Sequence, residues 1–222
     1  MYQIRQRTQG SKKVMFVVGV SGVARSGKNL FCDMLVDELS RQGYAGKQFA
    51  LADALKRDCA NFLNTFCKLD VHTDNTYQKS LFREFLVWYG DLKRKQSNGR
   101  HWIEKMDDTI SRYTGDVAII SDVRYDHYAN DELGWIIHEH EGLLVHLRRY
   151  EKSSTAVIDE TGNVTFEYIQ APNEHERVND PKLREGAHFR LDWPTVENPF
   201  DNLETRAMVQ DVANEIIELI NK

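Results

Sequence analysis

The sequence predicts an α/β fold with one parallel β-sheet flanked by helices. Short apolar segments alternate along residues 14–147 with longer segments in which apolar residues recur at helical spacing. Such alternation is typical of βαβ units, which build parallel sheets through right-handed crossovers. The chain has 222 residues, 41% of them hydrophobic, which is enough to bury the core of one domain. We therefore expect a single domain over residues 14–222, preceded by an N-terminal extension over residues 1–13.

The first predicted strand begins at residue 14 and leads into a predicted phosphate-binding loop. The sequence after it fits the pattern G-x-x-x-x-G-K and opens an amphipathic helix. In such a loop the backbone N–H groups and the positive end of the helix bind a nucleotide phosphate, and Lys28 neutralises the β- and γ-oxygens. The alternative is an ordinary βα turn with a surface lysine. The expected nucleotide-binding residues are Gly22, Ala24, Arg25, Ser26, Gly27, Lys28 and Asn29.

Hydrophobic periodicity also predicts the elements between this loop and residue 150. Amphipathic stretches are assigned to helices, and short apolar runs to buried strands. The predicted elements are a helix from residue 30 that ends at Gly43, a strand over 46–51, a helix over 52–63 with Asp53 as its N-cap, helices over 76–95 and 100–113, a strand over 116–122, a helix over 130–139 and a strand over 143–147.

The last third of the chain has a different pattern. Residues 156–169 alternate around a glycine turn, which predicts a β-hairpin, and we interpret about 150–185 as a loop-rich insertion within the domain. Residues 188–191 are expected to form a final edge strand. A closing helix over 203–220 would direct Met208, Val212, Ile216 and Leu219 inward.

Composition narrows the classes of partner. The formal charge is −5, so we expect no general binding to duplex nucleic acid, which requires a basic surface. Cys32, Cys59 and Cys67 are odd in number and lack metal-ligand spacing, which predicts reduced thiols packed in the core of a cytoplasmic protein. Residues 1–10 are polar, and no apolar run approaches the roughly 18 residues of a membrane span. The sequence leaves open whether the chain forms a homodimer.

An acidic residue and an arginine follow the strand over 116–122. Asp122 stands at the carboxyl end of that strand, where open α/β sheets bind ligands, and is the expected Mg²⁺ ligand, directly or through water. Its alternative role is to cap a helix in the segment that follows it. Asn29, which replaces the Ser or Thr of the common motif, is a second and weaker candidate for the metal. Arg124 would project from the same loop toward the phosphates.

Three further arginines are candidates because phosphoryl transfer depends on positioning and positive charge. Arg83 lies on a predicted helix and either belongs to its solvent-exposed face or reaches into the cleft. Arg148 and Arg149 follow a strand, and one of them is expected to close over the triphosphate; we assign this catalytic role to Arg149.

Two polar runs are ambiguous. The histidines of residues 138–141 do not have the i, i+4 spacing of a helical zinc pair, so we interpret this run as charges at a helix end. Residues 173–177 either line a substrate pocket or lie in solvent.

Four segments together resemble the bacteriophage deoxynucleoside monophosphate kinase family. The similarity covers roughly residues 14–150, with a weaker similarity at 175–181. The segments are residues 21–28, residues 51–56, the stretch 83–103, and residues 122–127 with 145–149.

This resemblance implies a P-loop nucleoside monophosphate kinase-like fold. The implied activity is transfer of the γ-phosphate of ATP to a deoxynucleoside 5′-monophosphate, with ATP and Mg²⁺ as cofactors, in the cytoplasm of the host cell if the chain is phage-encoded. By the resemblance, Lys28 would serve the donor, Asp122 the metal, and Arg83 and Arg124 the acceptor phosphate.

Two alternatives remain. One is a related phage kinase for a modified pyrimidine nucleotide, either free or within DNA. The net negative charge of the chain argues against DNA as the substrate. The other is a phosphate-binding scaffold without turnover, motivated by Asn29 and opposed by the presence of Lys28, Asp122 and Arg124. The sequence does not specify which base is accepted.

Overall fold

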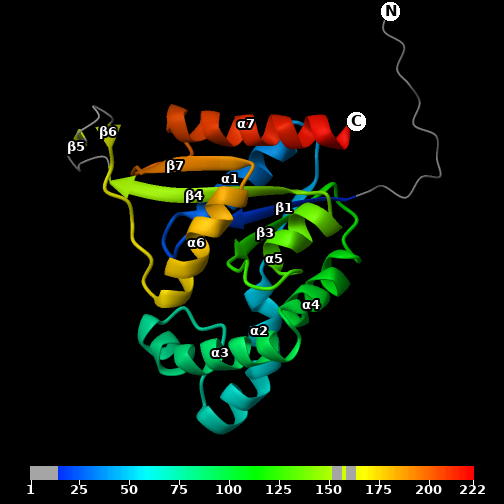
Figure 1. Ribbon diagram of the computed structural model, residues 1–222, viewed down its shortest axis with the longest axis vertical. Helices are drawn as coiled ribbons and strands as arrows, with labels where there is room; N and C mark the ends of the chain where they lie inside the picture. The colour runs from blue at the N-terminus through cyan, green and yellow to red at the C-terminus, as the bar shows by residue number, and fades with distance from the viewer. Residues whose placement is uncertain (1–14, 152–156, 159–163) are drawn as a thin grey trace, which may run out of the picture.

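A computed structural model describes residues 15–151, 157–158 and 164–222 (Figure 1). Its centre is a five-stranded sheet in the order β2-β3-β1-β4-β7, and every neighbouring pair is parallel. The α/β fold with a helix-flanked parallel sheet is therefore confirmed. The strands are β1 (Phe16–Ser21), β2 (Gly46–Phe49), β3 (Val117–Val123), β4 (Leu143–Glu151) and β7 (Phe189–Thr195).

Helices cover both faces of this sheet (Figure 1). One face packs against α1 (Lys28–Arg41) and α7 (Leu203–Ile220). The other packs against α2 (Leu51–Phe62), α4 (Arg100–Ile110), the short helix α5 (Glu132–Gly134) with the π-helical turn η2 (Trp135–Glu139), and α6 (Glu174–Gly186). A second π-helical turn, η1 (Leu63–Cys67), and α3 (Thr76–Gln96) extend α2 into a lobe away from the sheet.

The central strands build two cores by alternation. Val18 and Ile119 face the α1 and α7 side, whereas Val17 and Ile120 face the opposite side, and all four are fully buried. Successive side chains of a strand point to opposite faces, so a strand buried on both sides has to be apolar throughout. This is why the runs at β1 and β3 were recognisable in the sequence.

The order of the strands places the candidate loop at a switch in connection direction. From β1 the chain crosses through α1 to β2, at one edge of the sheet, and from β4 it crosses through α6 to β7, at the opposite edge. Ligands of open α/β sheets bind outside the carboxyl ends of the strands at such a point. The loop between β1 and α1 lies there.

Several predicted boundaries differ. α2 begins at Leu51 with Ala50 as N-cap, so Asp53 lies in the first turn and is not the cap. β4 continues to Glu151, because β7 pairs with it as far as Thr195. α4 ends at Ile110, short of the predicted residue 113. The predicted helix over 130–139 is mainly the π-helical turn η2.

The last third contains more regular structure than its sequence indicated. β5 (Val157–Ile158) and β6 (Val164–Thr165) pair antiparallel, as the hairpin prediction required, while residues 152–156 and 159–163 lie outside the described residues, as does the N-terminal extension. α6 replaces the expected loop and joins β4 to β7. It is strongly polar and contains Pro181, so it lacks the apolar periodicity that identifies a helix.

Other predictions can be checked directly. The closing helix α7 and its buried Val212 and Ile216 are as expected. Cys32 and Cys59 are buried, but Cys67 at the end of η1 is exposed, so its assignment to the core was wrong. Within the residues that the structure describes, no helix is long and apolar enough to span a membrane.

Candidate functional site

The loop between β1 and α1 has the backbone shape of a phosphate cradle. Gly22, Arg25 and Gly27 all have positive φ, at 133°, 68° and 90°. A Cβ on Gly22 would lie 2.4 Å from the carbonyl oxygen of Leu147, so only glycine fits there. The loop is thereby pressed against β4 and opens directly into the N-terminus of α1.

Lys28 is folded back into this loop. Its side chain is almost fully buried, and Nζ donates hydrogen bonds to the carbonyl oxygens of Gly22 at 2.7 Å and Val23 at 2.8 Å. Burial, followed by the positive charge of Arg124, lowers the pKa of Lys28 to about 8, although Glu176 and other carboxylates oppose the shift. An ammonium has three donors, so one N–H remains for a ligand.

Ser26 supplies a second group suited to an anion. Its hydroxyl is fully buried, and among the described residues it has no hydrogen-bond partner. An unsatisfied buried hydroxyl is costly, and a phosphate oxygen would satisfy it. Ala24 is half-buried in the same loop, whereas Arg25 is exposed to solvent.

A carboxylate from α6 occupies the loop. Oε2 of Glu176 accepts a hydrogen bond from the N–H of Ala24 at 2.6 Å, and Oε1 lies 3.6 Å from Nη1 of Arg124. Asn173, the N-cap of α6, holds the same carboxylate through Nδ2 at 3.3 Å. An anion therefore already sits between the loop and Arg124. The polar run 173–177 was a pocket-lining candidate, but its contact with a loop 152 residues away could not be read from the sequence.

Asp122 serves as a helix cap, although for α2, about 70 residues earlier in the chain, and not for the segment that follows it. Oδ1 accepts the N–H of Leu51 at 2.7 Å and Oδ2 the N–H of Ala52 at 2.9 Å, which caps α2 and explains why Asp53 does not. Burial raises the pKa of Asp122, although these hydrogen bonds and Arg124 act in the opposite direction. A carboxylate has about four acceptor positions, so Asp122 retains capacity for water or a metal.

Asn29, the second candidate for the metal, is directed toward β2. Asn29 is exposed, and its Oδ1 accepts a 3.4 Å hydrogen bond from Nε2 of Gln48 on β2. The described residues contain no cluster of three or more His, Cys, Asp or Glu side chains arranged to hold a metal. A Mg²⁺ ion here would take most of its ligands from nucleotide and water.

The structure brings together only some of the predicted arginines. Arg124 faces the Glu176 carboxylate that contacts the loop between β1 and α1, and its side chain is 47% exposed. Arg83 projects from the exposed surface of α3, outside this cluster. Arg149 donates through Nε to Oγ1 of Thr195 at 2.7 Å and is engaged with the edge strand β7.

Arg148 belongs to a charged cluster with α6, unlike Arg149. Its Nε lies 3.1 Å from Oδ1 of Asp192, to which Nη2 of Arg184 on α6 also donates at 3.1 Å. The hydroxyl of Tyr168 donates to the same carboxylate at 3.0 Å. These bonds lower the pKa of Asp192 even though burial acts to raise it. Sequence reasoning missed Arg184, which lies on the helix that it had not predicted.

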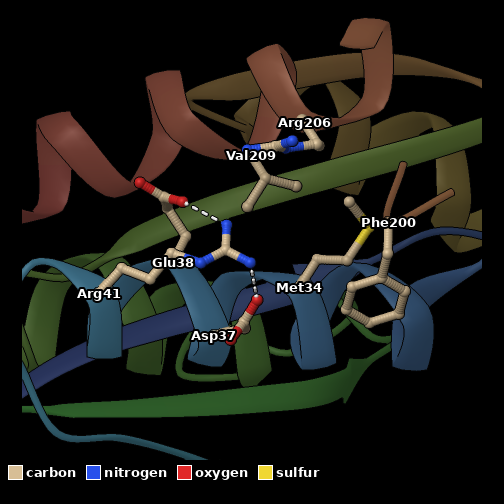
Figure 2. Close-up of a pocket in the computed structure, with 7 residues that line it drawn as sticks. All are labelled: Met34, Asp37, Glu38, Arg41, Phe200, Arg206 and Val209. Atoms are coloured by element: carbon tan, nitrogen blue, oxygen red, sulfur yellow. Dashed lines mark hydrogen bonds and ion pairs between the residues drawn. The ribbon is translucent and has the colours of Figure 1, made fainter. Parts of the chain in front are cut away.

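Two surface depressions lie apart from this site. The one in Figure 2, between α1 and α7, has a volume of about 10 Å³, which is room for a single water molecule. Its Arg41 is engaged by Asp37 and Glu38 (Figure 2). The other, of about 160 Å³, lies between α2 and α4 and is lined by Arg57, Lys105 and Arg112 among other residues. Neither is lined by a residue of the phosphate loop.

Comparison with known proteins gives little further information. No protein-family model matches the chain, and no curated protein matches it. Among the solved structures that match is the crystal structure of APE1195, with 16% sequence identity and a TM-score of 0.39; the alignment covers 94% of this chain and 98% of that chain. A likeness at this level says nothing of activity, so the function has to be argued from the site.

Proposed function

We propose that this protein transfers the γ-phosphate of ATP to a deoxynucleoside 5′-monophosphate. The observation that carries the proposal is the Glu176 carboxylate, an anion held between the N–H of Ala24 and the guanidinium of Arg124. A phosphate group could replace this carboxylate and meet the same donors. The choice of a deoxynucleoside monophosphate as acceptor rests on the resemblance of the four sequence segments.

On the donor side, three groups of the loop would bind the triphosphate. The loop N–H groups and the N-terminus of α1 supply partial positive charge, and Lys28 supplies a full charge. The Ser26 hydroxyl, which has no hydrogen-bond partner among the described residues, would donate to a phosphate oxygen. For Arg149 to act on the triphosphate it would have to leave Thr195, and Arg148 would have to leave its two-point pair with Asp192.

On the acceptor side, Arg124 and Arg83 would hold the monophosphate. An oxygen of the acceptor phosphate attacks the γ-phosphorus, the bond from that phosphorus to the β–γ bridging oxygen breaks, and ADP leaves with the electron pair. The attacking oxygen is already anionic, so no strong general base is required. The main requirement is positive charge that offsets the repulsion between two anions.

Mg²⁺, when bound with ATP, would neutralise charge on the β- and γ-oxygens. Asp122 would hold it, directly or through water, with the lone pairs that remain after it caps α2. Asn29 would contribute only if its side chain left Gln48.

Steady-state assays of ADP release test this proposal. The parent is assayed with each of the four common deoxynucleoside monophosphates, beside Lys28→Ala and Lys105→Ala. We expect turnover by the parent with at least one acceptor and a loss of about a hundredfold or more in Lys28→Ala, which removes a preorganised charge at the migrating group. Lys105, paired with Asp58 between α2 and α4, is the matched control and should leave the rate unchanged.

A phosphate-binding scaffold without turnover is the second candidate. Two observations favour it: both oxygens of Asp122 already accept backbone hydrogen bonds, and Asn29 is turned toward Gln48. ATP binding without ADP release for any acceptor would support this second function and contradict the first.

A further inference from the structure

A buried ionic cluster joins α3 to the segment that follows β3. Arg94 of α3 is 4% exposed, and Asp131 and Glu132 are also buried. Nη2 of Arg94 donates to both oxygens of Asp131, at 2.8 and 2.7 Å, and Nη1 donates to Oε1 of Glu132 at 2.9 Å. None of the three was a candidate in the sequence, because their contacts join residues 37 and 38 positions apart.

The two acids hold the backbone of the segment that carries Arg124. Oε2 of Glu132 accepts the N–H groups of Arg124 at 2.6 Å and Tyr125 at 3.1 Å. Oδ2 of Asp131 accepts those of His127 at 2.9 Å and Tyr128 at 3.2 Å. Four backbone N–H groups over residues 124–128 therefore depend on this pair of carboxylates.

The guanidinium of Arg94 also contacts the segment itself. It lies 3.6 Å from the centre of the Tyr125 ring, a cation–π contact. With both acids and this ring engaged, the planar group is held in one orientation. A lysine ammonium could replace its charge but not its fork of donors or its stacking.

Arg83 lies on the same side of α3 as Arg94. Both belong to the one continuous helix, eleven positions apart. Eleven residues are about three turns, so Arg83 lies roughly 16 Å further along nearly the same face. A contact that fixes the rotation of α3 at Arg94 therefore also fixes the direction in which Arg83 projects.

We infer that Arg94 is a positioning residue that fixes the Arg124 segment against the helix carrying Arg83. The role of these two arginines as acceptor ligands rests on the proposed function. Stability alone is a poor explanation of the cluster, because apolar residues of similar volume often replace a buried ion pair without loss of stability. What the ionic cluster adds is directional: each carboxylate oxygen has named donors, so only one arrangement of helix and segment satisfies them all.

The test uses Arg94→Lys in the full chain, with Arg41→Lys as the control. Arg41 is an exposed arginine of α1, paired with Asp37 and Glu38, remote from the acceptor side. We expect Arg94→Lys to raise the KM for the deoxynucleoside monophosphate about tenfold or more while the KM for ATP stays within about twofold, because misplacement by about 1 Å is enough for such a loss. The control should change neither.

Hydrogen exchange of backbone amides gives a readout that does not need activity. In Arg94→Lys the N–H groups of Arg124 and Tyr125 should lose protection, whereas those of β1 should keep it. If Arg94→Lys does not fold, Glu132→Gln is the substitute variant. Glu132 now accepts three hydrogen bonds, and the NH₂ end of an amide cannot accept, so at least one of these bonds would be lost.

Equal rises in both KM values would overturn the inference, as would unchanged protection of Arg124 and Tyr125, or lost protection with an unchanged acceptor KM. Absence of kinase activity in the parent is a separate outcome: it removes the proposed function, and amide exchange alone then decides whether Arg94 fixes the segment.

Discussion

Burial of the Lys28 ammonium, with Arg124 nearby, lowers its pKa to about 8, so its charge changes within the pH range of ordinary binding assays. Phosphate binding favours the charged form. Above about pH 8 the free protein must therefore take up a proton to bind ATP, and the affinity falls as the pH rises.

We expect the affinity for MgATP to decrease from about pH 7.5 to about pH 9.5, by up to about tenfold per pH unit above the pKa of Lys28. Isothermal titration at several pH values measures this. In Lys28→Arg, whose guanidinium stays charged, binding should be weaker but independent of pH over this range. The same decline in both proteins would assign the titration to another group.

Gly22 is the residue on which the shape of the loop depends most. In Gly22→Ala the new Cβ would lie 2.4 Å from the carbonyl oxygen of Leu147, at a φ of 133°. We expect ATP affinity to fall at least about tenfold, since the loop N–H groups must move away from the phosphate.

Gly43→Ala is the matched control for this prediction. Gly43 follows α1 with a φ of 84°, and a Cβ there would meet nothing within 4 Å. This variant should lose roughly 1–2 kcal/mol of stability through backbone strain and keep its ATP affinity. Equal ATP affinity in the two variants would contradict the assignment of the loop.

At the scale of elements, α6 connects both sides of the site. Glu176 reaches the phosphate loop, while Asn179 accepts the N–H of Asp126 at 3.4 Å and Lys182 donates to the carbonyl oxygen of Asp126 at 3.2 Å. An incoming phosphate has to displace the Glu176 carboxylate, and this cost is subtracted from the binding free energy.

Glu176→Gln should therefore bind ATP several-fold more tightly than the parent, since a neutral amide competes less well for the N–H of Ala24 in the loop. Glu174→Gln is the control; Glu174 lies in the same first turn of α6 but pairs with the exposed Arg177. Binding titrations with ATP measure the affinity of the two variants and the parent, and Glu174→Gln should match the parent. Weaker binding in Glu176→Gln would mean that this carboxylate assists the nucleotide.

Elements with strong periodicity were predictable from the sequence. The helices α1 and α7 and the strands β1 and β3 have apolar residues at the spacing that their burial requires, so their positions were close to those found. α6 was not predictable in this way. Few of its residues are buried, and polar contacts with distant loops and its Asn173 cap hold it in place.

At the scale of the molecule, the site combines one local motif with several distant contacts. The candidate phosphate loop is contiguous, so the spacing of Gly22, Gly27 and Lys28 was enough to single it out in the sequence, and the structure shows its positive-φ turn in front of α1. The partners that complete the site come from elsewhere: Glu176 from α6 and the Arg94 cluster from α3. Such pairings depend on how the helices dock, which residue spacing does not encode.

The central claim is phosphoryl transfer to a deoxynucleoside monophosphate, and following the γ-phosphate itself tests it most directly. The protein is incubated with ATP labelled in the γ-phosphate, Mg²⁺ and each deoxynucleoside 5′-monophosphate in turn, and the labelled products are separated. We predict label in the deoxynucleoside diphosphate for at least one base, and none with Lys28→Ala. Label found only in ATP or in inorganic phosphate, for every acceptor, would contradict the claim.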